Sequence, residues 1–237
     1  MVVTEARRRE IAAGLEAAHR RIAVAELEAG REPGSVELVV VTKTHAADEV
    51  EVLADLGVVH VGENRDQEGA PKAQLLQERH LVWHFIGQLQ TNKARSVVGY
   101  ADVVESVDRP KLVGALSRAA ASVRPPDRPL TCLVQVCLDD QPGRGGALPL
   151  DVPSLADQIV SAPGLELGGV MAVAPLETDP EGAFARLAEI AQGVADTHPE
   201  ATTVSAGMSG DLESAIRHGA TQVRLGSVVL GSRPPVG

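Results

Sequence analysis

The chain has 237 residues, of which 44% are hydrophobic and only 2% aromatic, and its formal net charge is -10. This length suits one α/β barrel or two small domains. The lack of aromatics predicts an aliphatic core, which layered parallel strands favour. The negative charge argues against binding to a nucleic-acid backbone, and no apolar run approaches the roughly 18 residues that cross a bilayer. The charged N-terminus also lacks the apolar run of a signal peptide. We therefore expect a cytoplasmic protein without nucleic-acid or membrane partners.

The first 30 residues predict one helix, because Ile11, Leu15, Ala18 and Ile22 recur at helical spacing. After this helix, short β-rich runs alternate with helical stretches. The predicted strands are 37–42, 58–61, 81–86, 102–106, 131–137, 167–172, 202–205 and 222–226. The predicted helices between them are 46–56, 64–78, 91–98, 109–121, 152–161, 180–196 and 210–218.

Local signals support several of these boundaries. Asp179 before Pro180 is typical of a helix start, and His218-Gly219 is typical of a helix end. The segments 124–129 and 141–146 have the composition of loops, the second of a mobile one, and neither resembles a domain linker.

Eight strands alternating with helices predict a (β/α)8 barrel of the TIM type, one domain over residues 1–237 with an extra N-terminal helix. An open, doubly wound sheet is the alternative. The two cysteines, Cys132 and Cys137, are five positions apart on one predicted strand and so point to opposite faces. We therefore predict free thiols in a reducing compartment.

A lysine follows the first predicted strand. Barrels of this type carry functional residues where strands end. Lys43 follows four consecutive apolar residues, 38–41, and Thr42, so the barrel mouth can desolvate its amine. Desolvation favours the neutral amine, the nucleophile that forms a Schiff base with an aldehyde. The alternative is an ordinary surface charge.

Small residues follow the last two predicted strands, where barrels often bind phosphate. Ser205, Gly207, Met208 and Ser209 form the first of these loops, and Gly226-Ser227 begin the second. Each alone suits an ordinary strand-to-helix turn, but both together favour a cradle for one phosphate. Pyridoxal 5'-phosphate (PLP) carries both an aldehyde and a phosphate, so the sequence predicts this cofactor.

Arg224 lies between Val223 and Leu225, so we expect it to point into the barrel while its neighbours point outward. A buried arginine needs a partner. That partner is either an acidic side chain or, if PLP binds, the pyridine nitrogen. A permanently charged donor keeps this nitrogen unprotonated and weakens the electron sink that PLP enzymes use.

Several segments in order resemble the pyridoxal phosphate homeostasis protein family (YggS/PROSC type) from about residue 36 onward. They are Val41-Thr42-Lys43-Thr44, Gly62-Glu63-Asn64, and the stretches 83–93, 205–213 and 223–227. The resemblance implies a barrel of the alanine racemase N-terminal type with PLP on Lys43. It also implies phosphate contacts at Ser205, Gly207, Gly226 and Ser227, Arg224 at the ring nitrogen, and Asn64 near the cofactor. Members of the family are described as cytosolic PLP carriers or regulators without demonstrated turnover.

Some positions have no assigned role or depart from the family. Asn92 and Lys93 match a motif of unclear role, and Lys93 is equally well read as a surface charge. Ala46 stands where the family often has proline, and Arg144 stands where it commonly has lysine.

The same barrel type occurs in amino-acid racemases, which need a second acid–base group. In those enzymes a tyrosine from a separate C-terminal domain supplies it. This chain stops at Gly237, and its one tyrosine, Tyr100, lies on a predicted helix-to-strand connection away from the strand ends. His84, between Trp83 and Phe85, is expected to be packed or hydrogen-bonded. We therefore predict a monomeric PLP carrier with PLP-dependent apo-enzymes as candidate recipients. The alternatives are a racemase and an interaction module without cofactor.

Overall fold

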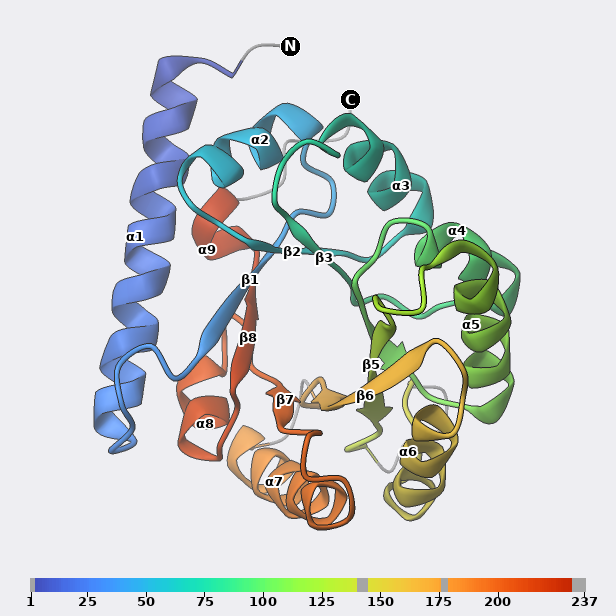
Figure 1. Ribbon diagram of the computed structural model, residues 1–237. Helices are drawn as coiled ribbons and strands as arrows, with labels where there is room; N and C mark the ends of the chain where they lie inside the picture. Colours follow the sequence, from blue (N-terminus) through green and yellow to red (C-terminus); the bar gives the residue numbers. More distant parts are fainter. Residues whose placement is uncertain (1–2, 140–144, 176–178, 232–237) are drawn as a thin grey trace.

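The described residues, 3–139, 145–175 and 179–231 of this computed structural model, form a closed barrel of eight parallel strands in sequence order. Strand β1 pairs with both β2 and β8, which closes the barrel and excludes the open sheet. Figure 1 shows the strands as an inner ring and the helices as an outer ring. The strands are β1 (Glu37–Val41), β2 (His60–Glu63), β3 (Val82–Phe85), β4 (Val103–Val107), β5 (Leu130–Val136), β6 (Leu165–Ala172), β7 (Thr203–Ser205) and β8 (Gln222–Leu225). The (β/α)8 prediction is confirmed.

Helices cover the outside of this barrel. They are α1 (Glu5–Glu28), α2 (Ala47–Asp55), α3 (Asp66–Leu75), α4 (Ala94–Val98), α5 (Pro110–Val123), α6 (Val152–Val160), α7 (Pro180–Thr197), α8 (Leu212–Arg217) and α9 (Ser227–Leu230). Short 3-10 turns, η1 (Thr91–Lys93) and η2 (Pro149–Asp151), precede α4 and α6. The structure thus splits the predicted helix 91–98, adds α9, and places β2 two residues later than predicted.

Helix ends are confirmed where capping chemistry marks them in the sequence. The Asp179 side chain accepts a hydrogen bond from the Glu181 N–H at the start of α7. Gly219 follows α8 with a φ of 92°, which glycine adopts without strain.

The N-terminal helix α1 lies outside the ring, beside α2, α8 and α9 (Figure 1). Its contact with α9 is close, because a Cβ at Gly14 would stand 2.3 Å from the Val229 carbonyl oxygen. Arg7 of α1 also donates to the Leu230 carbonyl oxygen at 2.7 Å and to Glu49 of α2 at 2.6 Å. Helix α1 therefore fixes the position of α9.

The aliphatic core lies between the strands and the helices, as in the cluster of Leu112, Leu116, Leu130 and Ile159. The barrel interior differs. Glu105 and Arg224 point into it and are 0% and 4% exposed. The expectation of a wholly aliphatic core is therefore wrong for the inside of the barrel.

Three smaller sequence predictions have outcomes here. Cys132 and Cys137 are buried and free, as predicted, and burial raises the pKa of the Cys132 thiol. None of the helices in the described ranges has the length and hydrophobicity of a membrane span. Residues 140–144, which include Arg144 and most of the predicted loop 141–146, lie outside the described residues.

Candidate cofactor site

A cavity of about 270 Å³ opens where β1 and β8 end and where the loop after β7 begins. This is the end of the barrel at which the sequence places the site. The predicted site residues that line the cavity are Lys43, Met208, Ser209, Arg224, Gly226 and Ser227. Residues from two distant parts of the chain thus meet at one opening.

Lys43 follows β1 and is half-buried at the cavity. The preceding residue, Thr42, is buried, and its hydroxyl donates to Glu63 at the end of β2 at 2.6 Å. Lys72 of α3 donates to the Thr42 carbonyl oxygen at 2.8 Å and to Glu63 at 2.6 Å. Burial raises the pKa of the Glu63 carboxyl, and Lys72 and Thr42 oppose this shift. These buried contacts fix the backbone from which Lys43 extends.

The turn after Lys43 has an unusual backbone. Thr44 adopts a φ of 67°, a left-handed conformation that is uncommon for threonine, and its N–H donates to Glu68 at 2.7 Å. Ala46 has a φ of -78°, close to the value that proline fixes. The alanine therefore keeps the backbone that a proline at this position would have.

The loop after β7 needs glycine at one position. Gly207 has a φ of 94°, and a Cβ there would stand 2.8 Å from the Ala215 Cβ. The Met208 N–H donates to Asp211 at 2.6 Å. Arg21 of α1 donates to the Ser209 carbonyl oxygen at 2.8 Å. These contacts hold Met208 and Ser209 at the cavity.

Arg224 extends from β8 into the barrel, as predicted. It donates to the Ser205 hydroxyl at 2.6 Å and to the Ala172 carbonyl oxygen at 2.8 Å, and it lies 3.6 Å from a Glu105 oxygen. Burial lowers the pKa of Arg224, and the Glu105 charge opposes this shift. The acidic partner expected for a buried arginine is present.

Ser205 and Asn64 lie differently from expectation. Ser205 is fully buried beneath Arg224, where its hydroxyl donates to Glu105 at 2.6 Å, and it does not line the cavity. This placement suits a residue that holds Arg224 rather than one that binds phosphate. Asn64 does not line the cavity either; its backbone packs against Gly87, and its Oδ1 is buried without a partner among the described residues.

Sequence reasoning missed several residues of the site. Thr44, His45 and Gly231 also line the cavity, and Gln222 lies beneath Arg224 with Ser205. The signal for Gln222 was present, since it is two positions before Arg224 on the same strand and so shares its inward face.

Other residues considered from the sequence lie away from the cavity. Lys93 forms an ion pair with Asp66 at 3.5 Å. His84 is buried and hydrogen-bonded, as predicted, with Glu105 at 2.7 Å and with His60 at 3.0 Å.

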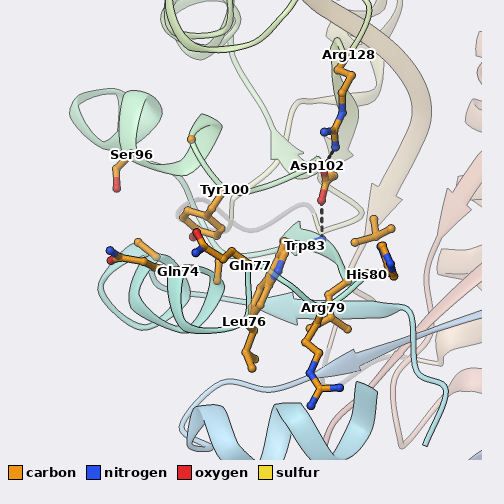
Figure 2. A pocket seen from close by; sticks show the side chains of 15 residues that line it. Gln74, Leu76, Gln77, Arg79, His80, Trp83, Ser96, Tyr100, Asp102 and Arg128 are labelled. Atoms are coloured by element: carbon orange, nitrogen blue, oxygen red, sulfur yellow. Dashed lines mark hydrogen bonds and ion pairs between the residues drawn. The ribbon is translucent and has the colours of Figure 1, made fainter. Parts of the chain in front are cut away.

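A larger groove of about 760 Å³ lies at the other end of the barrel, near the amino ends of β3, β4 and β5. Figure 2 shows its side chains, with Trp83 beside Tyr100 and Asp102 beside Arg128. None of the predicted site residues lines it. Tyr100 therefore lies away from the strand ends that carry Lys43, as the sequence predicted.

The family described as alanine racemase, N-terminal domain, matches residues 9–234. A pyridoxal phosphate homeostasis protein from Corynebacterium glutamicum is 42% identical over 212 residues, which span 87% of this chain and 95% of the relative. This chain belongs to the pyridoxal phosphate homeostasis protein family. The resemblance drawn from the sequence motifs is thereby confirmed.

Solved structures of similar chains share the fold of this family member. An unknown protein from Bifidobacterium adolescentis is 33% identical with a TM-score of 0.86, over 96% of this chain and 97% of that one. PipY from Synechococcus elongatus PCC7942, solved with PLP bound, is 31% identical with a TM-score of 0.80, over 93% of this chain and 100% of PipY.

Proposed function

We propose that this protein binds PLP in the cavity beside Lys43, holds it as a Schiff base, and contributes to intracellular PLP homeostasis. One observation carries the proposal. An amine, a buried guanidinium and two loops of small residues line the same cavity. The bound PLP of PipY and the names of the curated relatives support it.

The residues present fit this cofactor. Lys43 lines the cavity, and its amine would hold PLP by attacking the aldehyde carbon, with formation of a carbon–nitrogen double bond and loss of water. The hydroxyl and N–H groups of Ser209, in the loop before α8, and of Ser227, the first residue of α9, suit a phosphate. Gly226 is closely packed, because a Cβ there would stand 3.1 Å from the Val41 carbonyl oxygen. When bound, PLP supplies a reactive aldehyde and an electron-accepting ring.

The arrangement favours a carrier over a racemase. Arg224 is held by Ser205 and Glu105 as a hydrogen-bond donor, which would leave the ring nitrogen of a bound PLP unprotonated and its electron sink weak. Tyr100 lies at the other end of the barrel, and both ring nitrogens of His84 are engaged. Among the described cavity residues, His45 is the titratable side chain besides Lys43 and Arg224, and Glu49 holds its Nδ1.

Borohydride mapping tests the Schiff base directly, because the sequence has only four lysines. The protein is incubated with PLP, reduced with borohydride and digested for mass spectrometry. We expect the pyridoxyl label on Lys43, and we expect Lys43→Ala to lose both the label and the Schiff-base absorbance. Lys111→Ala, which changes an exposed lysine of α5, is the matched control and should keep both. A label that persists on another lysine in Lys43→Ala would refute the assignment.

Proton exchange separates the carrier from the racemase. Loaded protein is incubated with L-alanine in D2O, and the α-proton signal is followed by NMR. We expect no steady loss of this signal. A steady loss that both Lys43→Ala and His45→Gln abolish would replace the carrier by a racemase with His45 as the second base.

The proposal includes delivery of PLP by a monomer in the cytoplasm, in keeping with the free thiols of Cys132 and Cys137. Light scattering of the loaded protein should give the mass of one chain, and cell fractionation should place it with cytoplasmic markers. Activation of a PLP-dependent apo-enzyme by loaded protein, but not by loaded protein reduced with borohydride, tests delivery.

A further inference from the structure

A chain of polar side chains crosses the inside of the barrel from its amino end to Arg224. It consists of Glu37 on β1, His60 on β2, His84 on β3 and Glu105 on β4. A Glu37 oxygen lies 2.8 Å from His60 Nε2, His60 Nδ1 lies 3.0 Å from His84 Nε2, and His84 Nδ1 lies 2.7 Å from a Glu105 oxygen. Both nitrogens of each imidazole therefore have a partner.

The number of protons in this chain follows from its geometry. Three hydrogen bonds link two carboxyl groups through two imidazoles, and each bond needs one proton. Two neutral imidazoles supply only two protons. The third proton must sit either on a carboxyl group or on the histidine pair.

Glu105 does not hold the third proton. One of its oxygens accepts from His84 and from Gln222 at 2.8 Å, and the other accepts from Ser205 at 2.6 Å and faces Arg224. Burial disfavours its charge, but the His84 hydrogen bond and the Arg224 charge hold the pKa of Glu105 below its ordinary value. Glu105 is thus a carboxylate.

Glu37 does not hold the proton either. Its side chain is 46% exposed at the amino end of β1, where water stabilises the charged form. The hydrogen bond from His60 lowers the pKa of Glu37 below its ordinary value, although partial burial opposes this shift. The histidine pair is therefore left with the third proton.

We propose that His60 and His84 share one extra proton at neutral pH and thereby act as positioning residues for Glu105 and Arg224. The charges then alternate and cancel along the chain: Glu37 negative, the histidine pair positive, Glu105 negative and Arg224 positive. The other charged group that acts on Arg224 is Asp211 in the loop after β7. Exposure increases away from the cavity, from 0% at Glu105 to 23% at the His60 side chain, so protons enter from the end opposite Lys43.

The proton count is measured by NMR on the cofactor-free protein with ¹⁵N-labelled histidine at pH 7.5, so it does not depend on PLP binding. We expect three protonated ring nitrogens among the four of His60 and His84. Glu37→Gln should lower this number to two, because the glutamine amide can donate to His60 Nε2 and the extra proton is no longer needed. Glu166→Gln, an exposed position on β6, is the matched control and should leave three. Two protonated nitrogens in the wild type, or three in Glu37→Gln, would overturn the proposal.

The positioning role is tested by hydrogen exchange of the Arg224 guanidinium, again without cofactor. His84→Phe removes a donor from Glu105, and we expect exchange at least tenfold faster than in the wild type. His84→Asn can keep an N–H donor toward Glu105, so it should restore most of the protection. Unchanged exchange in folded His84→Phe would show that His84 has no positioning role. If that variant does not fold, His84→Ala takes its place, and unchanged Arg224 exchange in folded His84→Ala would show the same.

Discussion

Replacing Gly14 by alanine should weaken the protein, although alanine is the better helix former. The new Cβ would stand 2.3 Å from the Val229 carbonyl oxygen and 2.9 Å from that of Val228, so α1 and α9 must separate. Because both neighbours are backbone atoms, no rotamer change can relieve the contact. Overpacking of this kind costs about 1–3 kcal/mol, and the higher helix propensity returns about 0.5–1 kcal/mol. We expect a net loss of up to about 2.5 kcal/mol, which corresponds to a Tm up to about 10 °C lower.

Gly193→Ala provides the opposite case in the same chain. Gly193 lies inside α7, and a Cβ there would meet no atom within 4 Å. This variant should gain about 0.5–1 kcal/mol. Thermal unfolding followed by circular dichroism compares the two variants with the wild type. Because α9 begins at Ser227 of the cavity, Gly14→Ala should also bind PLP more weakly in equilibrium dialysis. A Gly14→Ala protein as stable as Gly193→Ala would refute the reasoning from the close contact of α1 and α9.

Two further variants test charges outside the cavity. Lys72→Met leaves the fully buried Glu63 without its cation and should lower the free energy of unfolding, measured in urea at pH 7, by about 3–5 kcal/mol. A loss below about 1 kcal/mol would contradict this. Adding Glu63→Gln to Lys72→Met should recover much of the stability. The Arg21 hydrogen bond lowers the pKa of Glu213 below its ordinary value of 4.5, so its stabilisation is present above that pH and is lost as the pH falls through the folded-state pKa. The Tm difference between the wild type and Glu213→Gln should therefore shrink as the pH falls from 6 to 4. At pH 6 this difference should correspond to less than about 1 kcal/mol, because the ion pair of Arg21 and Glu213 is partly exposed. A difference that grows toward pH 4 would argue against this ion pair.

The barrel could be predicted because its elements carry local signals. Apolar runs predicted the strands. The apolar stripe of Ile11, Leu15, Ala18 and Ile22 predicted α1, and these four residues are buried in the structure. The helix α9 was missed because its four residues, Ser227–Leu230, continue the β-rich composition of β8. Its position depends on the close approach of α1, a contact between distant parts of the chain.

The site was predictable at Lys43, Arg224, Ser209 and Ser227, because strand ends and alternation of inward and outward residues place them. The role of Ser205 was not predictable, because the direction of its side chain depends on Glu105, which is one hundred residues away in the sequence. Glu37, His60 and Glu105 were overlooked for a related reason. Each is a polar residue in a short strand, and their contacts depend on the pairing of strands that are distant in the sequence.

Closure of β8 onto β1 has a consequence for how the molecule matures. Lys43 comes from the first strand, whereas Arg224 and Ser227 come from the last, so a chain whose seam is still open has no composite cavity. Ligand capture then selects molecules that have finished folding. A captured ligand in turn holds the seam shut, because binding only to the folded form shifts the equilibrium away from opening.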